Sequence, residues 1–193
     1  MKHIALLTTL LLSASLQAVE KPYDYVFFEN SLMKGDYFYS QAKYTSPSWI
    51  KNARHHLPVA GSVAFTPGNS LELTYVSAPG GDWYSEIQYC PVRGNDFFRE
   101  PSTLSMQVRL RESMNAAALP NIAIRYADST YTQYLNLRNY LKDTRPGVWH
   151  PVSIPLEDFG LNAVNDTNIK KLGAVDLRPG TADGNEYTIY LDD

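Results

Sequence analysis

Acidic and histidine side chains are the residues of this sequence that could carry out acid–base or metal chemistry. A glycosidase needs two carboxyl groups across one glycosidic bond. No spacing of the kind Glu-x-Asp-x-x-Glu singles out such a pair among the 20 Asp and Glu residues. His55 and His56 are adjacent, so they would face opposite sides of a strand, and with His150 they do not form a zinc-binding spacing. No Gly-x-Ser-x-Gly motif occurs either. We therefore predict that the chain is not an enzyme.

Aromatic side chains offer a second kind of chemistry, because a flat apolar ring beside hydrogen-bonding groups suits a sugar. The chain has 14 Tyr, 7 Phe and 3 Trp residues. Such residues suit strands as well as binding surfaces, so composition alone does not choose between the two. Two turns, Gly80-Gly81-Asp82 and Ser46-Pro47-Ser48, are each followed by an aromatic residue that we expect at the rim of a sheet. The predicted glycan-binding residues are Trp83, Tyr84, Trp49, Arg125 and Tyr131.

The elements that would position these side chains are strands. Apolar residues alternate with polar ones in residues 70–76 and 104–110, and shorter alternating runs follow at 122–124, 135–137, 152–154 and 189–191. Turn signals such as Pro67-Gly68-Asn69 and Asp183-Gly184-Asn185 separate the runs. One short helical piece is expected around Glu112 to Ala118. About ten short strands at this spacing predict an all-β fold, an antiparallel β-sandwich of the jelly-roll type.

The N-terminus predicts export. Residues 1–18 combine a positive start at Lys2, an apolar run and small residues up to Ala18, which is typical of a cleavable signal peptide. A membrane anchor would need roughly 20 apolar residues, and this run is about half as long. We expect residues 19–193 to form a single β-sandwich domain in the periplasm, at the cell surface or in the medium, and to have no membrane span.

Charge and cysteine content exclude several classes of partner. The net charge is −3, without a basic cluster, so the sequence has no electrostatic footprint for nucleic acid. Cys90 is the single cysteine, so an internal disulfide is excluded. We expect Cys90 to be a small buried hydrophobic residue.

Three segments resemble the jelly-roll, galactose-binding-like modules of exported bacterial glycoside hydrolases, a kind of carbohydrate-binding module. They are Trp149-His-Pro-Val-Ser-Ile-Pro-Leu-Glu-Asp-Phe159, the closing Tyr190-Leu-Asp-Asp193, and the opening Phe27-Phe-Glu-Asn-Ser-Leu-Met33. Gly80-Gly-Asp-Trp83 is similar to such a module placed ahead of a catalytic domain. In similar modules another domain usually follows, so the resemblance implies that the chain could be truncated at its C-terminus.

The resemblance also implies a metal site. Related jelly rolls often hold a structural calcium ion where the terminal strands meet, and Glu29 and Asp192 match those positions. Calcium prefers six to eight oxygen ligands. A solvated or salt-bridged pair of carboxylates is the alternative.

Three functions remain open from the sequence. The first is a non-catalytic carbohydrate-binding module that recognises a polysaccharide or oligosaccharide through surface aromatics. The second is a structural domain that packs on a glycosidase catalytic domain or partner chain without binding glycan. The third, a β-sandwich hydrolase or lyase, would need two convergent acids or a Tyr-His-Arg cluster inside a cleft.

Overall fold

The chain folds into two antiparallel β-sheets with short 3-10 helices in the connections. The computed structural model describes residues 26–90, 103–161 and 172–193. The predicted signal peptide, residues 1–18, lies outside the described residues. The strands are β1 (Ser40–Thr45), β2 (Trp49–Ile50), β3 (Val59–Ala60), β4 (Ser70–Val76), β5 (Asp82–Gln88), β6 (Thr103–Leu110), β7 (Asn121–Tyr126), β8 (Leu135–Asn136), β9 (Trp149–Pro155), β10 (Leu172–Arg178) and β11 (Glu186–Asp192).

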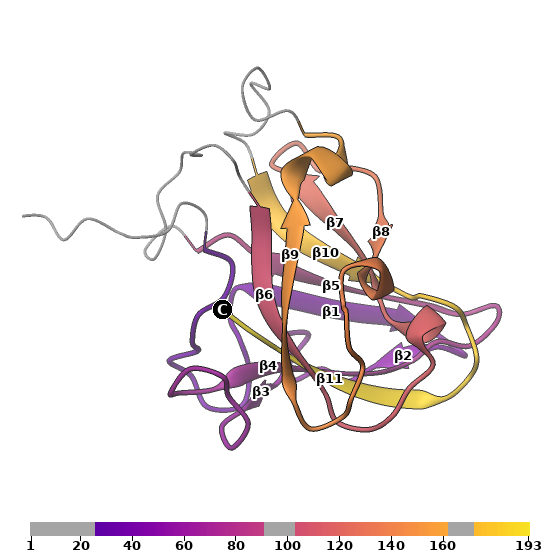
Figure 1. Cartoon of the computed structure of the whole chain (residues 1–193), viewed down its shortest axis with the longest axis horizontal. Helices are drawn as coiled ribbons and strands as arrows, with labels where there is room; N and C mark the ends of the chain where they lie inside the picture. Colours follow the sequence, from indigo (N-terminus) through magenta and orange to yellow (C-terminus); the bar gives the residue numbers. More distant parts are fainter. Residues whose placement is uncertain (1–25, 91–102, 162–171) are drawn as a thin grey trace, which may run out of the picture.

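The two sheets stack face to face (Figure 1). One sheet has five strands in the order β1-β5-β10-β7-β8, and the other has six in the order β2-β4-β11-β6-β9, with β3 paired to β4. Neighbouring strands in both sheets are antiparallel. Strands β6 and β9 cross over β10, β5 and β1 in Figure 1. This arrangement confirms the prediction of an all-β antiparallel sandwich.

Alternation of side chains builds the core between the sheets. In β4 the side chains of Leu71, Leu73 and Tyr75 are fully buried, while Glu72 points to the other face and pairs with Lys51. Tyr75 packs against Trp83 across the core, with ring centroids 4.7 Å apart. Alternation thus places one side of each sheet inside and leaves the other side for polar groups.

Short 3-10 helices replace two of the predicted elements. The helical piece expected at 112–118 is only η1 (Ala116–Ala118), whose N-cap Asn115 accepts a hydrogen bond from the backbone N–H of Ala117. The strand expected over 135–137 stops at Asn136. The Asn136 side chain accepts from the backbone N–H of Arg138 and so caps η2 (Leu137–Asn139). A third 3-10 helix, η3 (Leu156–Phe159), follows β9.

The connection between β10 and β11 lies tightly against η1. A Cβ on Gly180 would lie 2.2 Å from the carbonyl oxygen of Leu119, so only glycine allows this approach. The backbone N–H of Thr181 donates to the carbonyl of Ala117 at 2.8 Å. These contacts bring the β10–β11 connection beside β7 and β8.

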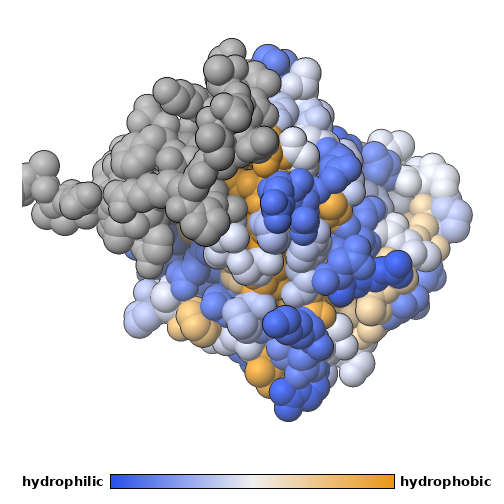
Figure 2. Space-filling model, turned by 45° about the horizontal axis from the view of Figure 1, so that its top comes forward, coloured by the Kyte–Doolittle hydropathy of each residue, from blue (hydrophilic) through white to orange (hydrophobic). Residues whose placement is uncertain are grey.

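The described surface mixes polar and apolar residues. On the face in Figure 2, hydrophobic residues reach the surface in separate areas among hydrophilic ones. In the described ranges, no helix is both long and apolar enough to cross a membrane.

Cys90 is 2% exposed, which confirms the expectation of a buried residue.

Candidate glycan-binding face

The outer face of the five-stranded sheet carries an aromatic and charged cluster. In β10, Val175 and Leu177 point into the core, so Asp176 and Arg178 point to the outer face. Asp176 is directly opposite Glu86 of β5 in the antiparallel register. Two carboxylates therefore lie side by side in the middle of the sheet.

Asp176 is the most buried charged residue of this cluster, with 0% exposure. Its Oδ1 atom accepts hydrogen bonds from the Tyr134 hydroxyl at 2.8 Å and from Arg178 Nε at 2.9 Å. Its Oδ2 atom is buried and has no hydrogen-bond donor among the described residues. Burial raises the pKa of Asp176, and this outweighs the lowering effect of Tyr134 and Arg178.

Arg178 links Asp176 to a second aromatic ring. Its guanidinium carbon lies 4.7 Å from the centre of the Tyr84 ring, in cation–π geometry. It also lies beside Asp82, with 3.6 Å between Nη1 and the carboxylate. Burial disfavours the charged guanidinium, but Asp176 and Tyr134 raise the pKa of Arg178, which therefore stays positive. One ring face of Tyr84 is thus covered by this cation.

Tyr131 and Tyr134 form the accessible aromatic pair. Their ring centroids are 6.2 Å apart with an interplanar angle of 24°, and their exposed fractions are 39% and 41%. The Tyr131 hydroxyl donates to Glu86 at 3.4 Å, a long hydrogen bond. Burial and the bond to Asp176 raise the pKa of Tyr134 to about 12, so its hydroxyl remains a donor. The pair offers two near-parallel, partly exposed rings with polar groups at their edges.

Glu86 completes the cluster with a second ion pair. Arg125 Nε lies 3.0 Å from Glu86 Oε1, without the linear geometry of a hydrogen bond. Each acid of the face is therefore matched by one arginine. We call this set the tyrosine face and define it by Tyr84, Glu86, Arg125, Tyr131, Tyr134, Asp176 and Arg178.

Three of the five predicted glycan-binding residues meet on the tyrosine face: Tyr84, Arg125 and Tyr131. The prediction that Trp83 lies at an exposed rim is wrong. Its ring is fully buried and its indole N–H donates to Ser77 at 2.9 Å. Trp49 lies in β2 of the other sheet, opposite Val76, and does not join the cluster.

The sequence reasoning missed Tyr134, Glu86, Asp176 and Arg178. A signal for two of them existed, because Asp176 and Arg178 alternate with Val175 and Leu177 in an otherwise apolar strand. Such charged residues on one side of a central strand mark a polar face. Tyr134 had no comparable signal, since it precedes a strand of only two residues.

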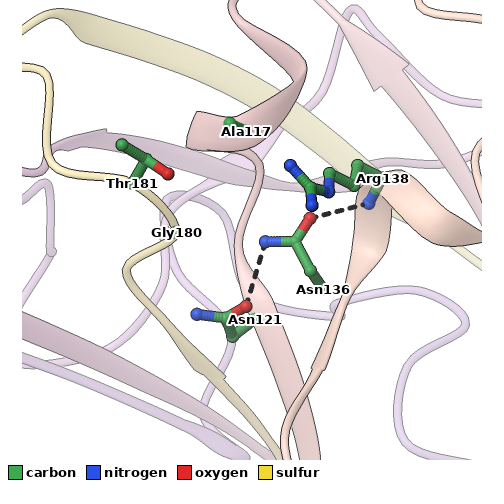
Figure 3. Close-up of a pocket in the computed structure, with 6 residues that line it drawn as sticks. All are labelled: Ala117, Asn121, Asn136, Arg138, Gly180 and Thr181. Carbon is green, nitrogen blue, oxygen red and sulfur yellow. Dashed lines mark hydrogen bonds between the residues drawn. The ribbon is translucent and has the colours of Figure 1, made fainter.

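A polar hollow of about 370 Å³ lies at the end of β7 and β8 (Figure 3). The Asn136 amide donates to Asn121 Oδ1 at 2.9 Å, and the Asn121 amide donates to the carbonyl of Pro179. Asn121 is opposite Arg178 in the strand register, so the hollow adjoins the tyrosine face. Its lining residues are Ala117, Asn121, Asn136, Arg138, Gly180 and Thr181.

The two residues expected to bind calcium have different surroundings. Asp192 is 2% exposed, and its Oδ2 atom accepts from the backbone N–H groups of Phe65 at 2.6 Å and Thr66 at 3.2 Å. Glu29 is exposed. Over residues 26–90, 103–161 and 172–193, no three His, Cys, Asp or Glu side chains form a metal-binding group. Asp192 therefore fits the role of a loop anchor better than that of a metal ligand, and calcium binding stays a prediction.

The comparisons assign this β-sandwich to a class, the carbohydrate-binding modules. Residues 24–193 match the model of the family described as carbohydrate binding domain 30. The chain belongs to this family of carbohydrate-binding domains. The resemblance found in the sequence is confirmed.

Two nearly identical relatives are longer than this chain. The chain is 99% identical over all 193 residues to an exo β-1,2-glucooligosaccharide sophorohydrolase (non-reducing end) of Parabacteroides distasonis, and it spans 27% of that protein. It is also similar to a crystal structure of a β-1,2-glucanase from Parabacteroides distasonis, with a TM-score of 0.84 and 99% identity, covering 90% of this chain and 25% of that one. The chain thus spans about a quarter of the length of these relatives.

A more distant solved structure has the same fold. The family 30 carbohydrate-binding module of a cellulosomal cellulase of Clostridium thermocellum matches with a TM-score of 0.63 and 18% identity, over 86% of this chain and 92% of that module.

Proposed function

We propose that this domain binds β-1,2-linked glucose chains on the tyrosine face. The observation that carries the proposal is the half-exposed Tyr131–Tyr134 pair beside two arginine-paired carboxylates. A glucose ring has an apolar C–H surface for stacking and hydroxyl groups that both donate and accept hydrogen bonds. The β-1,2 linkage is taken from the activity in the name of the 99% identical relative.

In a longer protein of that kind, the domain would hold glucan close to a catalytic domain and raise its local concentration. The tyrosine face itself would not hydrolyse the chain. Both of its acids are engaged with arginines, Glu86 with Arg125 and Asp176 with Arg178, and neither is placed as a free general acid. We expect the chain to release no sugar from β-1,2-glucan. Reducing-sugar release by the chain alone would contradict this.

Calorimetric titration with β-1,2-glucooligosaccharides tests the binding. We expect weak affinity, because a shallow surface gains little beyond its ordering costs. Tyr131→Ala should weaken binding at least about tenfold, since it removes one ring of the stacking pair. The matched control is Tyr44→Ala, a tyrosine of β1 that is more exposed than Tyr131, at 54%, and lies outside the tyrosine face. Equal losses in both variants would contradict the proposal.

The domain is also proposed to act outside the cytoplasm. The pattern of residues 1–18 supports this, with a positive start, an apolar run and small residues before Val19. Expression of the full chain in a Gram-negative host, followed by N-terminal sequencing of the periplasmic fraction, tests it. Uncleaved protein retained in the cytoplasm would contradict it.

A second candidate function is packing against a glycosidase catalytic domain without glycan binding. The outer side of the six-stranded sheet favours it, because the exposed Phe65 packs on Trp149 with centroids 6.1 Å apart, next to the exposed Val148. A contiguous apolar patch on this side would mark an interaction surface. The titration separates the two candidates, since a purely structural domain would bind none of the oligosaccharides.

A further inference from the structure

We propose that the polar hollow beside β8 is a second sugar subsite, which takes the ring adjacent to the one stacked on Tyr131 and Tyr134. The inference rests on the proposed function and deepens it. The Tyr134 hydroxyl bonds to Asp176, whose side chain lies on the same face of β10 as that of Arg178. Asn121 is opposite both Asn136 and Arg178 in the register. A glycan that lies on the tyrosine pair and extends along this face towards Arg178 would therefore reach the hollow.

The groups that line the hollow suit hydroxyls. Figure 3 shows Asn136 and Arg138 from the β8–η2 segment facing Thr181 of the β10–β11 connection, with Asn121 below. The guanidinium of Arg138 and the hydroxyl of Thr181 have no hydrogen-bond or ion-pair partner in the part of the chain that the structure describes. Asn136 Oδ1 accepts one hydrogen bond, from the backbone N–H of Arg138. Its second lone pair is therefore left for a ligand.

The mixture of donors and acceptors favours a neutral sugar over an anion. An anionic substituent would only accept hydrogen bonds, and it would face the carbonyl oxygens of Asn121 and Asn136 across the hollow. A sugar hydroxyl donates to these oxygens and accepts from Arg138 or Thr181. The volume of about 370 Å³ is within the usual range of small-ligand sites.

The shape of the hollow is also held by the backbone. Gly180 allows the β10–β11 connection to approach the carbonyls of Leu119 and Ala117, where a Cβ would lie 2.2 and 2.6 Å away. The Asn136 amide donates to the Leu119 carbonyl at 3.1 Å as well as to Asn121. The subsite is thus formed before a ligand arrives, which reduces the ordering cost of binding.

Affinity should then increase with chain length until both subsites are filled. We titrate the full chain with β-1,2-linked di-, tri- and tetrasaccharides of glucose. Arg138→Gln and Thr181→Val remove ligand-directed groups without breaking a hydrogen bond found in the described residues. We expect each to weaken tetrasaccharide binding about five- to tenfold and to change disaccharide binding less than about twofold, because the disaccharide stays on the tyrosine pair. The matched control is Arg111→Gln, an exposed arginine that follows β6 of the other sheet.

Different failures are distinguishable. If the unmodified chain binds no oligosaccharide, the proposed function and this inference both fail. If it binds and Tyr131→Ala abolishes binding, while Arg138→Gln and Thr181→Val have no effect at any length, only the second subsite is overturned. Equal losses for all three sugar lengths would also overturn it, since the hollow would then not be a separate subsite.

Discussion

At the scale of single residues, Asp176 is the unusual feature of the tyrosine face. A fully buried carboxylate is costly unless it is paired and hydrogen-bonded. Here Tyr134 and Arg178 both bond to Oδ1, and Oδ2 has no donor in the described ranges. Such a group fixes the positions of Tyr134 and Arg178 and makes their geometry sensitive to its protonation.

The raised pKa of Asp176 predicts a pH dependence of stability. The folded state binds this proton more tightly than the unfolded state, so the contribution of Asp176 to the free energy of unfolding falls as pH rises from its ordinary value of 3.8 through the raised pKa. Asp176→Asn has no such step. Denaturant unfolding from pH about 3.5 to about 7 should show the wild-type minus variant difference decreasing with pH.

Asp143 provides a control of opposite sign. The backbone and side chain of Arg145 lower the pKa of this exposed carboxyl, so Asp143 stabilises above its unfolded pKa and its contribution is lost as pH falls. The wild-type minus Asp143→Asn difference should increase with pH. If the wild-type minus Asp176→Asn difference also increased with pH, the hydrogen bonds of Asp176 would lower its pKa more than burial raises it.

Trp83 and Tyr84 show how far a residue type predicts its role. Both follow the Gly80-Gly81-Asp82 turn, but alternation sends Trp83 into the core and Tyr84 to the outer face. A turn does not tell which of two consecutive residues faces inward, because that depends on the register with β1 and β10.

Trp83→Ala should therefore reduce stability and not affinity. Removing a fully buried Trp typically costs about 3–5 kcal/mol in the free energy of unfolding. Trp49→Ala should reduce the free energy of unfolding less, because Trp49 is only half-buried. Chemical denaturation measures both variants, and titration under native conditions should show unchanged glycan binding for the folded Trp83→Ala protein. A stable Trp83→Ala protein with lost binding would return Trp83 to the site.

At the scale of elements, alternation predicted the core strands well. Residues 70–76 form β4 and residues 104–110 lie within β6, because a two-residue period directly determines which side chains are buried. The segment 135–137 was less predictable. Asn136 bonds the backbone of Arg138 and starts η2, so local capping outweighed the alternation of Leu135 and Leu137.

The candidate site was predictable only in part, for a different reason. Tyr84, Arg125 and Tyr131 were found by residue type. Their meeting with Asp176 and Arg178 depends on pairing β5 and β7 with β10, whose residues are distant in sequence. Pairings of this kind are not visible in local patterns.

Gly180 lies in the β10–β11 connection and lines the hollow. Gly180→Ala should reduce the free energy of unfolding by about 1–3 kcal/mol, because its Cβ would overlap the backbone carbonyl of Leu119. Gly61→Ala is the control, since a Cβ at that position has no atom within 4 Å. Thermal unfolding of both variants measures the effect. Equal melting temperatures would contradict the tight packing of the β10–β11 connection.

At the scale of the whole molecule, the two outer faces differ in character. The tyrosine face presents paired charges around half-exposed rings, while the six-stranded sheet presents Phe65 beside Trp149. A domain with two such faces could bind glycan on one side and a neighbouring domain on the other.

Calcium binding is tested on the whole molecule. If Glu29 and Asp192 share a structural ion, chelation should lower the melting temperature by several degrees, because a ligand that binds only the folded state stabilises it. If Asp192 acts only through Phe65 and Thr66, chelation leaves the melting temperature unchanged. Asp192→Asn, assayed with and without chelator, separates loss of the ion from loss of the loop anchor.

The most direct test of the account is to map the bound glycan by NMR. A β-1,2-linked tetrasaccharide of glucose is titrated into the isotopically labelled chain, and amide shifts are followed residue by residue. We predict that the largest shifts lie on β5, β7, β8 and β10, around Glu86, Tyr134 and Asp176, with little change on β4, β6 and β11. Shifts centred on the six-stranded sheet, or none at saturating sugar, would contradict glycan binding by the tyrosine face.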